Sequence, residues 1–275
     1  IGRTNQLGID LYQPLDARQR YFVESGLSYG KETMGFYQDD HKLADYEMFR
    51  GVASLGAGVN VGQLGQLHAG WRKRWLEYDL TTGIPSFIFP DSATGTSSGA
   101  YLALDFDQMD RLYFPTSGWS ARFGYFNSPN EDYGKLTIDL HGAYALDDYV
   151  LNAKFLYQGA LQGRLPIYDA GTLGGFHNLG GFAPNQLIGD DIRYFGLRAE
   201  KIIGRLPLGL RGDMRAGLAL ETAKVGRPYM ETKRTGWLNS ATLYLGGETP
   251  LGPVYLGYGQ SDSGASSVYL FIGTP

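Results

Sequence analysis

The sequence predicts an all-β fold, an antiparallel transmembrane β-barrel of the outer-membrane type. Apolar and polar residues alternate along most of the chain, aromatic residues gather towards strand ends on the apolar face, and short and long connections alternate. About thirteen strands are expected, near 3–14, 18–30, 44–61, 64–82, 98–108, 118–127, 134–146, 149–162, 192–204, 209–223, 237–248, 253–262 and 266–273.

Alternation with a period of two assigns the two faces of each strand. In the strand expected at 134–146, Leu136, Ile138 and Leu140 share one face, while Asp139 and His141 share the other. We expect the apolar face to contact lipid and the polar face to line the lumen. The same reasoning places Phe155 and Leu218 towards lipid, and it places these residues in the lumen: Lys154, Arg211, Asp213 and Arg215.

The charge on the polar face separates a membrane barrel from a soluble β-sandwich. In a sandwich, that face meets bulk water and usually mixes Lys, Glu and Thr. An apolar band with aromatic girdles opposite a charged face is typical of an outer-membrane barrel. The aromatic residues are Tyr21, Tyr29, Trp71, Trp75, Trp119, Tyr125 and Tyr157; the charged face carries Arg72, Arg74, Arg122, Asp139, Lys154, Arg193, Arg198, Glu200, Arg211, Asp213 and Arg215.

The connections follow the rule of short periplasmic turns and long outer loops. Short connections such as "GQLG" and "LDD" alternate with long ones at 31–43, 83–97, 163–191 and 224–236. An odd strand count puts the first strand on the wrong side, because both ends of a bacterial barrel lie in the periplasm. We therefore expect either that the first strand is spurious or that an odd number of strands is missing upstream of the 1–275 barrel domain.

Composition excludes several functional classes. The 275 residues include 40 Gly and no Cys, so neither disulfides nor Cys-ligated metal sites are expected. The formal net charge of −4 argues against nucleic acid as a partner. No run approaches the ~18 apolar residues of a membrane-spanning helix. No two histidines have the spacing of metal ligands, and no cofactor is predicted.

Residues 171–191, "GTLGGFHNLGGFAPNQLIGDD", resemble the inward-folded loop of the bacterial surface-antigen superfamily, the BamA, TamA and FhaC type of outer-membrane assembly and translocation barrel. The family loop reads Leu-Gly-Gly, a few residues, then Arg-Gly-Phe or Arg-Gly-Tyr, with an acidic residue in the following strand. The matching residues are Leu173, Gly174 and Gly175, then Gly181 and Phe182, with Glu200 as the acid. Gly180 stands at the arginine position and departs from the family pattern.

A second motif, "DQMDRLYFPTSGWSARFGY" at 107–125, resembles the family's Phe-Pro-x-x-Gly turn and the strand after it. The resemblance implies sixteen strands with five after the loop, so three N-terminal strands would be absent here. The opening "YQPLDARQRYFVESGLSYG" at 12–30 looks most like the patatin-like branch, the PlpD type. In that branch a patatin-like lipase domain and a POTRA domain precede the barrel.

The resemblance implies a barrel in the bacterial outer membrane that anchors or translocates an N-terminal domain and is not itself an enzyme. Its partners would be outer-membrane lipid and lipopolysaccharide, the outer-membrane assembly machinery and its own periplasmic domains, with a homo-oligomer left open. A porin-like passive channel is the alternative, although porins lack this loop motif. Barrels of this kind usually end on an aromatic residue, so we expect further residues after Pro275.

Three motifs that suggest other chemistry have simpler explanations. "GLSYG" at 26–30 fits Gly-x-Ser-x-Gly, but Ser28 lies in an alternating strand rather than on a strand-to-helix turn. His141 beside Asp139 lacks an evident nucleophile, which a hydrolase dyad requires. The glycine-rich loop precedes a strand, whereas phosphate-binding loops precede a helix.

We expect the loop at 163–191 to fold back into the lumen. Its apolar residues argue against disorder, and its glycines suit a backbone that turns tightly near a wall. Since Gly180 has no side chain to pair, backbone hydrogen bonds, His177 and Asn178 should hold the tip, with Arg211, Asp213 and Arg215 as wall partners. We also expect the tip to be less firmly fixed than in related loops. The predicted loop motif is Leu173, Gly174, Gly175, Phe176, His177, Asn178, Gly180, Gly181 and Phe182; the predicted wall is Arg72, Arg74, Asp139, Glu200, Arg211, Asp213 and Arg215.

Overall fold

The computed structural model describes residues 4–84, 90–205, 212–234, 236–249 and 252–273. They form a 14-stranded antiparallel sheet in which every strand except β9 pairs with its neighbours in chain order. One 3-10 turn, η1 (Ile167–Asp169), precedes β9. The strands are β1 (Thr4–Pro14), β2 (Tyr21–Gln38), β3 (His41–Val61), β4 (Gly65–Gly83), β5 (Ser92–Asp107), β6 (Gly118–Ser128), β7 (Tyr133–Leu146), β8 (Tyr149–Gln162), β9 (Gly171–Leu173), β10 (Leu187–Arg205), β11 (Asp213–Pro228), β12 (Trp237–Thr249), β13 (Gly252–Ser261) and β14 (Ser266–Ile272).

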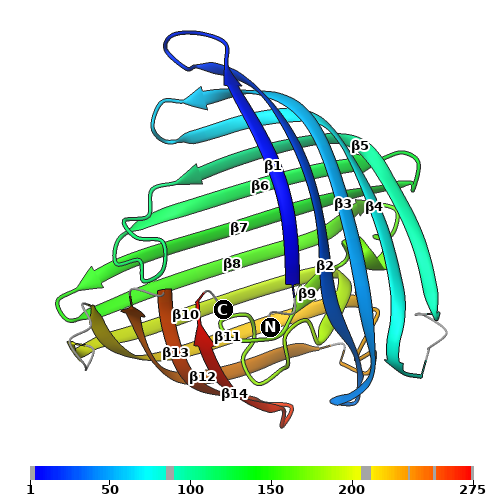
Figure 1. Ribbon diagram of the computed structural model, residues 1–275. Coiled ribbons are helices and arrows are strands. Elements are labelled where there is room, and N and C mark those ends of the chain that lie inside the picture. The colour runs from blue at the N-terminus through cyan, green and yellow to red at the C-terminus, as the bar shows by residue number, and fades with distance from the viewer. Residues whose placement is uncertain (1–3, 85–89, 206–211, 235, 250–251, 274–275) are drawn as a thin grey trace.

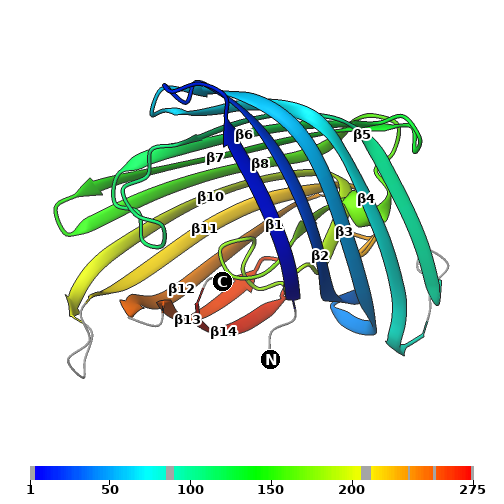
Figure 2. The ribbon, with the colours of Figure 1, turned by 45° about the horizontal axis from the view of Figure 1, so that its top comes forward.

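The sheet curls into a deep trough with β1 and β14 at its two edges, which do not pair within the described residues (Figure 1). The segment between β8 and β10 lies inside the curve (Figure 2). This arrangement confirms the predicted outer-membrane type of barrel with its long loop turned inward. The short β9 pairs with the start of β10, so the loop is less irregular than the sequence suggested.

The two faces of the strands follow the predicted alternation. On β11, Leu218 is 39% exposed on the convex face, whereas Arg215 and Glu221 are buried on the concave face. On β8, Phe155 faces outward and is 37% exposed. The convex face therefore carries the apolar band, and the concave face carries the buried charges.

Arg193 was assigned to the wrong face. On β10 the inward side chains have even numbers, such as Tyr194 and Glu200, which are both buried. Arg193 points outward and pairs with Asp191 at 2.9 Å. Arg211, which the sequence placed on the lumenal wall, lies outside the described residues.

All four of the predicted long loops are partly strand: β5 begins at Ser92 within 83–97, β9 and the start of β10 lie within 163–191, and the other two loops contain the ends of longer strands. Residues 31–38 belong to β2 and 41–43 to β3, and β11 continues to Pro228. In this extension Met34 and Phe36 point inward and pack with Tyr46, Met48 and other buried residues. The pattern is the reverse of that in the apolar band: the inward face is apolar and the outward face is more polar. Because the prediction relied on apolar residues on the outward face, it ended these strands too early.

The interior is filled by side chains from both halves of the sheet. One cluster joins β2, β3 and β4 to Ile188, Tyr229 and Met230, while a second surrounds the loop residues Leu173, Leu179 and Phe182. No helix among the described residues is long and apolar enough to cross a membrane.

We predict that Leu140→Arg will impair insertion, because an arginine on the lipid face at mid-bilayer costs about 2–4 kcal/mol. Leu140→Ala is the matched control, since it removes the same side chain without adding charge. Heat-modifiable mobility in gels after folding into vesicles measures the inserted fraction. Equal insertion of the two variants would contradict the assignment of this face to lipid.

Candidate functional site

The inward loop enters the trough after β8 and presents its tip, residues 173–182, to the C-terminal strands. Leu173, Leu179 and Phe182 are fully buried there, against residues of β8, β10, β11 and β12. Burial of these side chains contributes roughly 1.5–3 kcal/mol each. The tip is therefore anchored by packing as well as by the polar contacts described next.

Glycines shape the tip for two different reasons. Gly174, Gly175 and Gly181 have φ values of 113°, 109° and 94°, which residues with a side chain rarely adopt. Gly180 is needed because the backbone passes close to β12: a Cβ there would lie 1.9 Å from the Thr242 Oγ1. The family's arginine has no room at this position, which explains the departure noted in the sequence.

Glu221 on β11 holds the tip from the wall. Its carboxylate accepts the backbone N–H of Leu179 at 3.1 Å and of Gly180 at 2.8 Å. It also accepts the hydroxyls of Tyr194 at 2.7 Å and Ser240 at 3.0 Å. The side chain is 4% exposed, so these four donors replace the water that the charge has lost. Such charge-assisted bonds are stronger than neutral ones.

A second wall contact comes from β14. The Tyr269 hydroxyl accepts the N–H of Gly181 at 3.1 Å and donates to the carbonyl of Phe182 at 3.1 Å. The Ser267 hydroxyl donates to the carbonyl of Gly181 at 3.0 Å. The backbone of the tip is thus bonded to β11 and to β14 at the same time.

His177 fixes the side of the tip. Its ring stacks on Phe176 with centroids 3.8 Å apart, and its Nδ1 accepts a hydrogen bond from Arg198 Nη1 at 2.8 Å. Burial, and then the charge of Arg198, lower the pKa of His177 well below its usual value. The ring is therefore neutral and serves as an acceptor. Among the described residues, Asn178 contributes backbone bonds within the tip, to Gly174 and Gly175, and no side-chain bond.

The wall residues predicted as partners of the tip have other contacts. Arg215 donates to Glu200 at 2.9 Å, and Glu200 also accepts the Tyr244 hydroxyl at 2.7 Å. Asp213 starts β11 opposite Arg205, and Asp139 lies opposite Arg122 on β6. Among the described residues the backbone of the tip is bonded to Glu221, Tyr269 and Ser267, and no contact to Asp213 or Arg215 is found. The alternation that places Arg215 in the lumen also places Glu221 there, since both have odd numbers on β11, but no motif in the sequence singles out Glu221.

The base of the loop is bonded to the N-terminal half of the sheet. Asp169 in η1 pairs with Arg74 on β4 at 2.7 Å and with Lys135 on β7 at 3.0 Å. It also accepts the Tyr133 hydroxyl at 2.8 Å. Burial would raise the pKa of the Asp169 carboxyl, but Lys135 and Arg74 outweigh burial and lower it. Arg74 is thus a wall partner of the loop, and the Arg72 guanidinium lies over the Tyr101 ring at 4.4 Å.

Glu231, in the connection after β11, joins the loop to the tip of the β2–β3 hairpin. It accepts the backbone N–H groups of Asp39 at 2.9 Å and Asp40 at 2.8 Å, and the Gln186 side-chain amide at 3.2 Å. The side chain is 1% exposed. The β2–β3 turn and the connection after β11 therefore meet at Gln186 of the inward loop.

The Phe-Pro-x-x-Gly turn closes the other end of the trough. Phe114 is 3% exposed and packs on Tyr255 of β13, with ring centroids 5.1 Å apart. Asp110 caps the turn by accepting the N–H groups of Thr116 at 2.8 Å and Ser117 at 3.1 Å. Burial raises the pKa of Asp110, but these bonds prevail and lower it to about 2.

The alternative chemistries find no support in the geometry. Ser28 lies within β2 rather than on a nucleophile elbow. His141 bonds Asn152 at 3.2 Å, and no hydrogen bond to Asp139 is found among the described residues. No group of His, Asp and Glu side chains in the described ranges could hold a metal ion.

We predict that Glu221→Gln will loosen the tip. Loss of the charge weakens bonds worth about 1.5–3 kcal/mol, which corresponds to tenfold or more in the open population. Because the chain has no Cys, Asn178→Cys gives a single reporter whose thiol-labelling rate measures opening. Glu24→Gln, an acid that bonds His68 rather than the tip, is the control. An unchanged labelling rate in the Glu221 variant would contradict the role of this carboxylate.

We also predict that Gly180→Ala will displace the tip, because the added Cβ overlaps Thr242 Oγ1. The same Asn178→Cys reporter should label faster in this variant. Adding Thr242→Ala removes the overlapping hydroxyl and should restore part of the protection. If the double variant labels as fast as Gly180→Ala alone, the close approach is not the reason for this glycine.

The comparisons with solved structures show the fold. BamA from Haemophilus ducreyi lacking POTRA domains 1–3 superposes with a TM-score of 0.73 at 14% identity, over 98% of this chain and 61% of that chain. CdiB from Acinetobacter baumannii gives 0.61 at 13% identity, over 94% of this chain and 46% of that one. CdiB from Escherichia coli gives 0.61 at 12% identity, over 97% and 52%.

The chain spans only about half to three-fifths of the length of these solved structures. No curated protein matches the sequence. The Omp85 superfamily domain, however, matches residues 2–226, which is most of the chain. This match confirms the superfamily expected from the loop and turn motifs and places the protein in the bacterial outer membrane. The chain belongs to the Omp85 superfamily of outer-membrane assembly and translocation barrels.

Proposed function

We propose that this chain is the barrel of an outer-membrane translocator and that its inward loop keeps the barrel closed. The observation that carries this proposal is the double attachment of the loop. Its tip is bonded to Glu221 and Tyr269, and its base is bonded to Arg74 and Lys135, on opposite parts of the sheet. A segment held at both ends across the interior obstructs free passage. The superfamily assignment does not favour the porin-like alternative.

The passenger is an N-terminal patatin-like domain that precedes this chain, joined through a periplasmic domain of the POTRA type. The support is the resemblance of residues 12–30 to the PlpD branch, together with a barrel sequence that offers no catalytic constellation of its own. Insertion relies on the outer-membrane assembly machinery, and the outward face contacts outer-membrane lipid and lipopolysaccharide. Hydrolysis then belongs to the passenger, and anchoring or export belongs to the barrel.

Conductance of the full-length protein in planar bilayers tests the closed barrel. We expect little steady current from the unaltered protein, and larger, longer openings after residues 174–186 are replaced by a short Gly-Ser linker. The control is a variant in which the two residues of the exposed turn at 147–148 are replaced without a change in chain length. A large steady current in the unaltered protein would instead support a porin-like channel.

The passenger is tested separately by expressing the gene with its upstream coding region. We expect esterase activity on short-chain esters from the longer protein and none from residues 1–275 alone. Replacing the catalytic serine of that patatin-like domain should abolish the activity. An upstream region without a patatin-like domain would contradict this part of the proposal and leave the closed barrel unaffected.

A further inference from the structure

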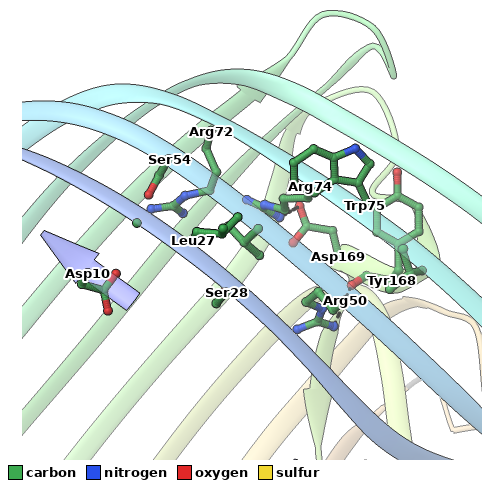
Figure 3. Close-up of a pocket in the computed structure, with 13 residues that line it drawn as sticks. Asp10, Leu27, Ser28, Arg50, Ser54, Arg72, Arg74, Trp75, Tyr168 and Asp169 are labelled. Carbon is green, nitrogen blue, oxygen red and sulfur yellow. Dashed lines mark hydrogen bonds and ion pairs between the residues drawn. The ribbon is translucent and has the colours of Figure 1, made fainter. Parts of the chain in front are cut away.

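A cavity of about 270 Å³ lies on the concave face between β1–β4 and the base of the inward loop. Figure 3 shows that the side chains of Arg50, Arg72 and Arg74 lie around this space, with Asp169 and Tyr168 of the loop on one side and Asp10 on the other. Ser28 and Ser54 also line it. The volume is just below the usual range for sites that take drug-sized ligands, so it suits a small group.

The positive charge of this cavity is not balanced by its own carboxylates. Asp169 is already shared between Arg74 at 2.7 Å and Lys135 at 3.0 Å. Arg50 makes one long contact, 3.4 Å, to the carbonyl of Tyr168. Arg72 is partly buried and lies over the Tyr101 ring. The nearest further carboxylates, Glu24 and Asp169, are already bonded to other groups, Glu24 to His68 and to the Tyr101 hydroxyl. Within the described residues neither Arg50 nor Arg72 forms an ion pair.

The remaining carboxylate of the cavity, Asp10, does not supply the missing partner. It belongs to the edge strand β1, is exposed, and forms no ion pair within the described part of the chain. Its Oδ1 and the Ser54 hydroxyl both lie close to Gly26. Keeping several cations together on a partly enclosed wall is costly unless an anion compensates them. The geometry therefore leaves a place for a negatively charged group between the arginines.

We propose that this cavity binds a phosphate group, which bridges Arg50 and Arg72 and receives further hydrogen bonds from Ser28 and Ser54. The planar guanidinium group donates two parallel hydrogen bonds to phosphate oxygens, which a single ammonium group does not. The hydroxyls of Ser28 and Ser54 are additional donors. Since Arg74 and Asp169 also line the cavity, a bound phosphate would lie against the base of the inward loop. This site is independent of the proposed translocation function.

Calorimetric titration tests the site, using the full-length protein folded in phosphate-free, uncharged detergent. Inorganic phosphate should bind saturably with about one equivalent. Arg72→Gln and Arg50→Gln should each weaken binding by about tenfold or more, as expected for loss of one charge-assisted contact. Arg122→Gln is the matched control, because Arg122 lies on the concave face opposite Asp105 and Asp139 and does not line the cavity.

Glycerol 3-phosphate, which carries the phosphate as a lipid headgroup does, distinguishes a lipid headgroup from free inorganic phosphate as the natural ligand. Tighter binding of glycerol 3-phosphate than of inorganic phosphate, with the same loss in the arginine variants, identifies a lipid headgroup as the source. Tighter binding of inorganic phosphate identifies the free ion. The Arg50→Gln variant is expected to fold normally, because Arg50 is exposed and its replacement removes only one long hydrogen bond. Absence of saturable binding, or equal affinities in the Arg50, Arg72 and Arg122 variants, would overturn the proposal.

Discussion

The arrangement of the interior depends on one buried carboxylate. Glu221 has lost nearly all contact with water, so its charge must be met by protein donors. It takes two of them from the loop backbone and two from hydroxyls on β10 and β12. Removing the tip would leave a charge half satisfied inside the barrel, which is strongly unfavourable. The tip and the wall therefore form one unit, and the position of the loop follows from it.

The loop also connects parts of the sheet that are distant along the chain. Its tip is bonded to β11 and β14, while Asp169 at its base is bonded to β4 and β7. Glu231 ties the β2–β3 hairpin to the connection after β11. At the other end, Phe114 reaches Tyr255 on β13. These contacts explain how a curled sheet with two unpaired edges in the described residues keeps a filled interior.

Alternation was enough to predict the strands within the apolar band, because lipid and lumen impose opposite polarity on neighbouring residues. It failed at Met34 and Phe36, where the strand leaves the band and the apolar side turns inward. The inward fold of the loop was predictable from its glycines and its resemblance to a family. Its partner was not, because Glu221 and Arg215 share a face, and only the folded structure shows that Leu179 and Gly180 donate to Glu221. Since the backbone donates to Glu221, the tip keeps charge-assisted contacts that the sequence appeared to have lost.

The most direct test of this account is amide hydrogen exchange at the loop tip of the membrane-embedded protein. The N–H groups of Leu179 and Gly180 are bonded to a buried carboxylate, so the account predicts protection comparable to that of the β11 amides. Protection at both positions should fall in Glu221→Gln, while the β11 amides stay protected. Exchange of these two amides as fast as that of the exposed turn at residues 147–148 would show that the tip is not seated on the wall, and the central claim would fail.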